Sequence, residues 1–348
     1  MHRLWKNRAK RIAITGGLEA AHLVAALRLM RNARGRGAIF TLHHVRPHEP
    51  HAFEPNRHLE ITPEFLDVAL TRLAHDGYRF VALDEIPALL SGPAGDQPFA
   101  AFTLDDGYRN NLVHAYPIFE KHEAPFTVFV TKGLTERTHT IWWETLAAIL
   151  RKAEQVRFDF GAGEETITLG TLADQHAAFS RFAAHVHRTD EASTVAKIDA
   201  LARHREVDPA ELVDDLVMGA AELNLLDASP LASIGAHTVS HRALARLPES
   251  QAREDMALSA DHVEAITGKR PEAFAFPYGT PEAATYREAK IAAELGFKVA
   301  VTTRPGIMRP DLPGGTAYLP RLSLNGFYQR PRYVSALASG IPLKLMGR

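Results

Sequence analysis

Three short motifs place carboxylates, imidazoles and a tight turn directly after apolar segments. They are residues 103–107 (Thr-Leu-Asp-Asp-Gly), 237–241 (His-Thr-Val-Ser-His) and 274–279 (Phe-Ala-Phe-Pro-Tyr-Gly). Two adjacent aspartates leave a strand end in different directions, so one can bind a metal ion while the other acts as a base. Two imidazoles four residues apart face the same way if a helix begins there, which suits one divalent ion. The Pro-Tyr-Gly turn can aim a backbone N–H into a cleft as an oxyanion donor.

Each motif also has a purely structural interpretation. Asp-Asp-Gly is a common turn sequence, and Pro-Tyr-Gly can be an ordinary connection between a strand and a helix. A His-x-x-x-His pair arises by chance in a chain with 18 histidines. Cysteine is absent from the sequence, so a thiolate metal site, a cysteine nucleophile and a disulfide scaffold are excluded. Any metal site must therefore use histidine and carboxylate ligands.

Predicted strands and helices alternate along the chain, and this alternation positions the motifs. Apolar runs predict strands at residues 38–42, 79–83, 99–104, 126–130, 231–236, 273–276, 298–302 and 319–324. Helical spacing and end signals predict helices at residues 63–76, 116–122 and 283–295, and a short one from residue 84. Strands alternating with helices predict an α/β fold with a parallel sheet, open or closed as a barrel. The motifs then lie at carboxyl ends of strands, where such folds place catalysis.

The 348 residues divide into three regions. Residues 1–37 are predicted to be a basic, mostly helical N-terminal extension, with positive charges at Arg3, Lys6, Arg8, Lys10, Arg11, Arg28, Arg31, Arg34 and Arg36. Residues 38–348 form the predicted α/β domain, which a helical insertion at 150–229 interrupts. The insertion is predicted to contain one hairpin, from 156–160 and 166–169.

Charge and hydropathy exclude several partners. Lys and Arg total 40 and Asp and Glu total 41, which argues against nucleic-acid binding. We expect no transmembrane segment, because no stretch approaches the roughly 18–20 uninterrupted apolar residues of a membrane span. The start of the chain lacks the unbroken apolar core of a secretory signal. We therefore expect a cytoplasmic protein, with contact between the basic extension and the inner membrane face as the alternative.

The order of the three motifs, all at predicted strand ends, resembles the polysaccharide deacetylase family (the NodB homology domain, carbohydrate esterase family 4). The resemblance covers residues 38–148 and 230–325, so residues 38–348 are expected to be an interrupted NodB-like domain. It implies a distorted (β/α)7-type barrel and a divalent metal ion, usually Zn²⁺. Position by position, it implies Asp105 as general base, Asp106, His237 and His241 as metal ligands, and the Tyr278 backbone as oxyanion donor.

Two departures from the family pattern have candidate replacements. The family usually carries an arginine just ahead of Pro-Tyr-Gly and a late Leu-x-His that supplies the general acid, and neither is present here. Residues 42–45 (Leu-His-His-Val) resemble an early motif of the branch related to poly-N-acetylglucosamine deacetylases, in which the motif order is permuted. This implies His43, rather than His44, as the acid. Arg321 in the last predicted strand either orients Asp105 and lowers its pKa or makes a salt bridge at the rim.

The predicted reaction is hydrolysis of N-acetyl groups in oligo- or polysaccharides that contain N-acetylglucosamine, such as chitooligosaccharides. Trp142, Trp143, Pro277 and Gly279 are the predicted substrate-binding residues, with one tryptophan in the cleft wall and the other in the core. The saccharide would be either soluble or lipid-linked, and the ligand types would also accept cobalt, nickel or manganese. The alternatives are hydrolysis of a formamide or an O-acetyl ester, or a catalytically weak carbohydrate-binding relative.

Overall fold

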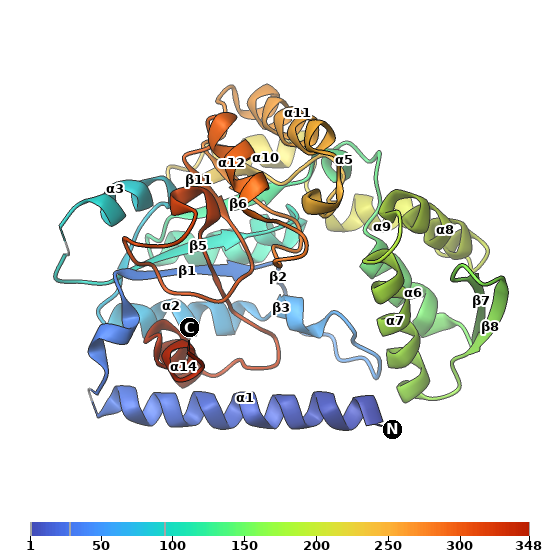
Figure 1. Cartoon of the computed structure of the whole chain (residues 1–348), viewed down its shortest axis with the longest axis horizontal. Helices are drawn as coiled ribbons and strands as arrows, with labels where there is room; N and C mark the ends of the chain where they lie inside the picture. Colours follow the sequence, from blue (N-terminus) through green and yellow to red (C-terminus); the bar gives the residue numbers. More distant parts are fainter. Residues whose placement is uncertain (1, 28, 94, 348) are drawn as a thin grey trace.

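A computed structural model of the chain shows a parallel sheet that curls into a barrel (Figure 1). It describes residues 2–27, 29–93 and 95–347, in which seven strands follow one another in the order β11-β10-β9-β6-β5-β1-β12. Their bounds are β1 Gly37–Leu42, β5 Phe99–Leu104, β6 Phe126–Val130, β9 Ala232–Ala236, β10 Ala273–Ala275, β11 Val299–Val301 and β12 Leu322–Ser323. The predicted α/β barrel is confirmed.

The segment that ends in β12 closes the barrel. Leu319 forms a parallel bridge with Val301 of β11, and Leu322 pairs with Phe40 of β1. Residues 319–323 therefore pair with β11 on one side and with β1 on the other, which completes the ring. The strand predicted at 79–83 is shorter, since only β4 (Arg79–Phe80) pairs with β5, beside the ring.

The barrel has an apolar interior and an apolar outer layer because strand side chains alternate between the two faces. Ile39, Ala101 and Phe129 lie in the inner cluster, whereas Phe40 and Phe102 belong to the outer one. The helices packed outside include α2 Pro63–His75, α4 Tyr116–Lys121, α10 Ala220–Asp227, α11 Glu249–Thr267 and α12 Tyr286–Glu294. The smaller elements include the helix α3 Ile86–Ser91 and a parallel pair of strands, β2 His44–Val45 and β3 Glu60–Ile61.

Local sequence explains why α2 begins and faces the barrel as it does. The Thr62 hydroxyl accepts a hydrogen bond from the Phe65 N–H, and Pro63 occupies the first turn. Leu66, Leu70 and their helical neighbours form a buried stripe against the sheet. This is the cap and the apolar face that the sequence predicts.

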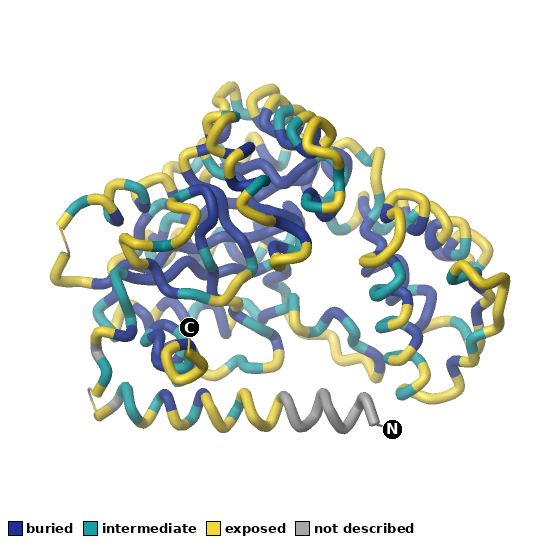
Figure 2. Tube along the Cα trace, in the orientation of Figure 1, coloured by how far each residue is buried: buried dark blue, intermediate teal, exposed yellow. Residues whose placement is uncertain are grey.

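A second lobe lies at the end of the barrel toward which the strands point, and it has its own buried interior (Figures 1 and 2). Its elements are α6 Trp142–Lys152, β7 Gln155–Asp159, β8 Glu164–Thr168, α7 Leu172–Val186, α8 Glu191–Arg203 and α9 Pro209–Leu216. Phe158, Phe182 and Ile198 are at its centre. Helix α10 packs instead against β9 and α11 of the barrel. By packing, the lobe therefore spans residues 142–216, earlier than the predicted insertion at 150–229.

Helix α1 (His2–Ala26) runs along α13 (Pro331–Ala338) and α14 (Ile341–Leu345). Leu18 and Ala21 are buried against these helices, and Glu19 pairs with Arg332. The side chains of residues 1–10, 26, 28 and 31 lie outside the described part of the chain, and with them most of the basic charges predicted for the extension. Among the described helices, none is both long and apolar enough to cross a membrane.

Candidate metal and catalytic site

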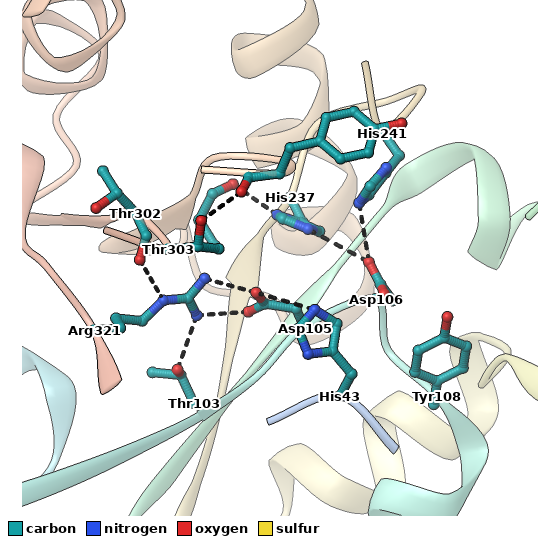
Figure 3. A network of polar contacts seen from close by, with 12 residues as sticks. His43, Thr103, Asp105, Asp106, Tyr108, His237, His241, Thr302, Thr303 and Arg321 are labelled. Atoms are coloured by element: carbon teal, nitrogen blue, oxygen red, sulfur yellow. Dashed lines mark hydrogen bonds and ion pairs between the residues drawn. The ribbon is translucent and has the colours of Figure 1, made fainter. Parts of the chain in front are cut away.

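The carboxyl ends of the strands bring the predicted site residues together at one end of the barrel (Figure 3). His43 follows β1, Asp105 and Asp106 follow β5, His237 and His241 follow β9, Tyr278 follows β10, and Arg321 precedes β12. Asp105 continues the series of alternate β5 residues that face the barrel interior, as the two-residue period of a strand requires. Asp106 turns away in a left-handed conformation, with φ 71°.

Asp106, His237 and His241 form a group that could hold a metal ion. One Asp106 carboxylate oxygen (Oδ1) lies 3.5 Å from His237 Nε2 and 3.2 Å from His241 Nε2. One ligand atom from each residue lies within 4.8 Å of the others. His237 Nδ1 lies 2.7 Å from the Ala275 carbonyl, which can only accept, so Nδ1 carries the hydrogen and Nε2 keeps its lone pair.

The donor set fits a divalent cation. Asp106 Oδ1 and His241 Nδ1 are buried without a hydrogen-bond partner in the described part of the chain, and an unpartnered buried carboxylate oxygen is costly. Burial acts to raise the pKa of Asp106, but His241 and His237 outweigh it and hold that pKa well below the usual range. An ionised carboxylate facing two imidazole nitrogens is a three-residue metal site that leaves coordination positions open.

A loop, rather than a helix, aims the two histidines. Thr238 and His241 both have positive φ (69° and 53°), and the Thr238 hydroxyl accepts a hydrogen bond from the His241 N–H at 2.9 Å. Asp255 of α11 accepts the Val239 N–H at 2.7 Å. The condition under which the spacing would align the two rings, a helix that begins here, is therefore not met. Both rings nevertheless face Asp106 because the loop doubles back.

Arg321 holds Asp105 through two parallel hydrogen bonds. Its Nη1 and Nη2 lie 2.7 and 2.6 Å from the two carboxylate oxygens. The same guanidinium donates to the Thr103 hydroxyl at 2.9 Å and to the Thr302 carbonyl at 2.8 Å, and Arg321 is only 1% exposed. The alternative of a rim salt bridge is therefore wrong. Burial acts to raise the pKa of Asp105, but the Arg321 charge and hydrogen bonds hold it below its ordinary value.

The two neighbouring histidines at the end of β1 point to different places. His43 Nε2 lies 3.9 Å from Asp105 Oδ2, and its side chain is 19% exposed. His44 is fully buried, stacks on Tyr108 with ring centroids 3.6 Å apart, and meets the Asn110 amide at 2.8 Å. Burial lowers the pKa of both histidines; Asp105 and Asp106 oppose this at His43. Of the two, His43 is the one placed beside Asp105.

The turn after β10 is tight and specific in sequence. Tyr278 has φ 60° and Gly279 has φ 56°. A Cβ on Gly279 would lie 2.3 Å from the Thr303 nitrogen, so a larger residue does not fit. Thr303 donates to the Tyr278 carbonyl at 2.5 Å, while the Tyr278 N–H makes no hydrogen bond to any described residue. Pro277 and Gly279, which the sequence predicts to be substrate-binding residues, are both buried. In this structure they shape the turn.

Both tryptophans are core residues. Trp142 and Trp143 are 5% and 7% exposed, which leaves little indole surface for a sugar to stack on. Trp142 donates to the Tyr278 hydroxyl at 3.0 Å, and Trp143 donates to the Tyr108 hydroxyl at 3.1 Å. The Trp143 ring also lies 4.8 Å from that of His241. The contacts in this structure favour a supporting role for both rings over the predicted sugar platform.

Glu191 of α8 has no counterpart among the predicted site residues. Its carboxylate accepts two hydrogen bonds: Oε1 accepts one from the Tyr278 hydroxyl, and Oε2 accepts one from the Ala243 backbone N–H. Glu191 is buried, and it ties the inserted lobe to the turn after β10 and to the loop after His241. An acidic residue in the first turn of a helix is an ordinary pattern. The sequence therefore carried no signal that singled it out.

Glu144 was also missed, although it directly follows the two tryptophans. Its carboxylate accepts a hydrogen bond from the Asn56 amide at 2.9 Å and lies 3.9 Å from His44 Nε2. Burial raises the pKa of Glu144 to about 7. This carboxyl therefore changes charge near neutral pH inside the wall of the site.

A sequence profile of the polysaccharide deacetylase family matches residues 93–300. The chain belongs to this family, and its class is that of carbohydrate N-deacetylases. The matched range contains Asp105, Asp106, His237, His241 and Tyr278. His43 and Arg321 lie outside it. No curated protein matches the sequence.

Solved structures with this fold are distant in sequence. The deacetylase PplD of Streptococcus pyogenes, in complex with acetate, superposes with a TM-score of 0.55 at 19% identity, over 83% of this chain and 92% of PplD. IcaB from Ammonifex degensii gives a TM-score of 0.53 at 18% identity, over 88% of this chain and 98% of IcaB. A polysaccharide deacetylase from Bacillus cereus gives 0.52 at 15% identity, over 87% of this chain and 68% of that protein. These similarities support the fold.

Proposed function

We propose that this deacetylase removes acetyl groups from N-acetylglucosamine residues of oligo- or polysaccharides, with Zn²⁺ held by Asp106, His237 and His241. One observation carries the proposal. A buried Asp106 oxygen without a hydrogen-bond partner in the described chain faces two imidazole nitrogens, beside a second aspartate that Arg321 keeps ionised. A ligand group next to a separate base is what metal-assisted amide hydrolysis needs.

The ligand residues and the base have separate roles in the proposed reaction. When bound, the divalent ion supplies Lewis-acid polarisation of the amide carbonyl and lowers the pKa of water. Asp105 takes a proton from the attacking water, because its low pKa leaves it unprotonated and Arg321 fixes its orientation. Asp106, His237 and His241 would hold the ion next to this base.

Two further groups complete the reaction. The Tyr278 N–H donates to the carbonyl oxygen as negative charge develops on it. His43, on the exposed side of Asp105, donates a proton to the leaving nitrogen. The new bond joins the water oxygen to the acetyl carbon and the C–N bond breaks, so the products are acetate and a free amino sugar.

The test is mass spectrometry of N-acetylglucosamine oligomers after incubation with the zinc-loaded protein. We expect products that have lost one or more acetyl groups, together with free acetate. Asp106→Ala should abolish acetate release, and the exposed variant Asp261→Asn on α11 should release it at the wild-type rate. Acetate release by Asp106→Ala at the wild-type rate would contradict the proposal, as would a formate product in place of acetate.

A further inference from the structure

A cavity of about 640 Å³ lies outside the metal site, between the β11–β12 connection and α14. The described residues that line it include Arg304 and Arg309 and no carboxylate. Neither arginine makes an ion pair within the described part of the chain. Arg304 lies over the Tyr318 ring, 5.2 Å from its centroid, at the side of the cavity. The cavity therefore offers two guanidinium groups that no described carboxylate neutralises, and guanidinium groups are well suited to bind a phosphate.

A second cavity, of about 200 Å³, adjoins the first and is apolar. Pro305 and Leu343 line both cavities, so the two lie side by side, and we call the pair the cleft. The second part is walled by Ile14 and Leu18 of α1 and by Leu337 of α13. The cleft is thus cationic at one end and lined by hydrocarbon at the other. A ligand that satisfies both ends must be an anionic amphiphile.

The cationic part of the cleft begins at the turn that carries the proposed oxyanion donor. Thr303 lines the cavity and donates to the Tyr278 carbonyl, and Thr280 lines it two residues beyond Tyr278. Beyond the apolar part, Ile12, Leu345 and Met346 are 65%, 62% and 68% exposed. Exposed apolar side chains beside an apolar groove mark surfaces that bind a protein, a ligand or a membrane, and a lipid chain is one such partner.

We propose that this cleft binds a lipid phosphate, with the phosphate at Arg304 and Arg309 and the hydrocarbon chain against α1 and α13. A saccharide carried on that phosphate reaches the metal site past Thr303. This inference rests on the proposed function and names its substrate class as a lipid-linked N-acetylated saccharide. Charge complementarity selects the phosphate, and the adjoining apolar groove selects a lipid over a soluble phosphate ester.

Isothermal titration calorimetry on the full chain tests the site with three probes: farnesyl phosphate, farnesol and inorganic phosphate. We expect farnesyl phosphate to bind about tenfold or more tightly than either of the others, because only it engages both ends. Arg304→Gln combined with Arg309→Gln should weaken it by about tenfold, and so should Ile14→Ser, whose side chain is already partly exposed. Lys290→Gln on α12 is the matched control, since its side chain is 79% exposed away from the cleft.

Equal affinity for farnesyl phosphate and inorganic phosphate, or unchanged binding by the double arginine variant, would overturn the lipid site. So would binding of UDP-N-acetylglucosamine that matches farnesyl phosphate and is insensitive to Ile14→Ser. Acetate release from soluble N-acetylglucosamine oligomers separates the two proposals. A protein that releases acetate but does not bind farnesyl phosphate overturns only the lipid site. One that binds it but releases no acetate from soluble or lipid-linked saccharide overturns only the proposed function.

Discussion

The ion pair of Arg321 and Asp105 sets the electrostatics of the site at the scale of single residues. Both side chains are almost completely removed from water, and the guanidinium makes hydrogen bonds to a carboxylate, a hydroxyl and a carbonyl. A lysine cannot reproduce this planar, forked arrangement. Removing one partner from such a pair leaves a buried charge uncompensated, at a cost of about 3–5 kcal/mol.

Arg321→Lys should therefore change the pH dependence of catalysis as well as its rate. Arg321 lowers the pKa of Asp105 through its charge and through two hydrogen bonds, and a lysine keeps the charge but not the paired hydrogen bonds, so that pKa should rise. The acid limb of the kcat/KM profile should move to higher pH, because the base is protonated over a wider range. The measurement is kcat/KM against pH on folded protein, with Arg270→Lys at an exposed ion pair as control. An acid limb that stays in place would show that Arg321 does not tune the base.

The adjacent histidines should separate catalysis from stability. His43→Asn should lower kcat by about 10²- to 10⁴-fold, the usual range for a general acid, with little change in Tm because this side chain is partly exposed. His44→Asn should lower Tm instead, because it removes a buried ring stacked on Tyr108. Turnover and thermal unfolding of both variants check this. If His44→Asn loses turnover without losing stability, the acid is His44.

Glu144 should make stability depend on pH near neutrality. Burial raises its pKa from 4.5 to about 7 in the folded protein, so between these values the unfolded chain loses a proton that the folded protein keeps. The contribution of protonated Glu144 to the free energy of unfolding is therefore complete below pH 4.5 and is lost as the pH rises through about 7. At 1.36 kcal/mol for each pKa unit, the loss is about 3 kcal/mol. Urea unfolding of wild type and Glu144→Gln should show a difference that grows by this amount between pH 4.5 and 8, and Glu164→Gln on the exposed hairpin should show none.

At the scale of elements, the inserted lobe and the barrel share the site. Helix α8 supplies Glu191, and α6 supplies Trp142, and both side chains hydrogen-bond to the Tyr278 hydroxyl. Glu191 also accepts a hydrogen bond from the loop that follows His241. From outside the barrel, the lobe therefore contacts the turn that carries the proposed oxyanion donor, Tyr278, and the loop that follows His241.

A double-mutant cycle should reveal this connection. Glu191→Ala and Tyr278→Phe each remove the shared hydrogen bond, so their effects on kcat and on stability should not add. We expect a coupling of about 0.5–3 kcal/mol between the two positions. Thermal unfolding and steady-state kinetics of both single variants and the double variant measure it. Additive effects would show that the lobe and the turn act independently.

Elements and motifs differed in how far the sequence could predict them. Runs such as 99–104 and 126–130 are strands because buried parallel strands are continuously apolar, and this pattern is local. The group of Asp106, His237 and His241 was predictable because strand ends meet at one edge. The left-handed loop at Thr238 and the burial of Trp142 depend on packing between distant segments. Glu191 belongs to the same class, since nothing nearby in the sequence marks its partner.

At the scale of the whole molecule, the candidate metal site joins segments that are far apart in the chain. Asp106 follows β5, and the two histidines follow β9, so only the folded barrel presents all three ligands together. A ligand that binds the native state alone stabilises it by mass action. The lobe, the barrel and the metal site should therefore unfold at a higher temperature when metal is bound.

Addition of Zn²⁺ to the metal-free protein should raise its Tm. At a concentration 1,000-fold above Kd, the expected stabilisation is about 4 kcal/mol. Calorimetry with and without a chelator checks this. Asp106→Ala should lose the increase, and Asp255→Asn, which alters the loop without removing a ligand, should keep part of it. A Zn²⁺-induced increase that survives in Asp106→Ala would place the metal elsewhere.

Barrel closure by the β12 segment has a consequence for the order of events during synthesis. Asp105 and Arg321 are 216 positions apart, so the ribosome makes the proposed base long before the arginine that pairs with it. Until the last strand docks between β11 and β1, we expect the barrel to stay open and the Asp105 carboxylate to stay hydrated. We therefore expect a nascent chain that lacks only this segment to be inactive. Hydrolysis should begin only after the segment from Leu319 to Ser323 has closed the barrel beside the proposed base.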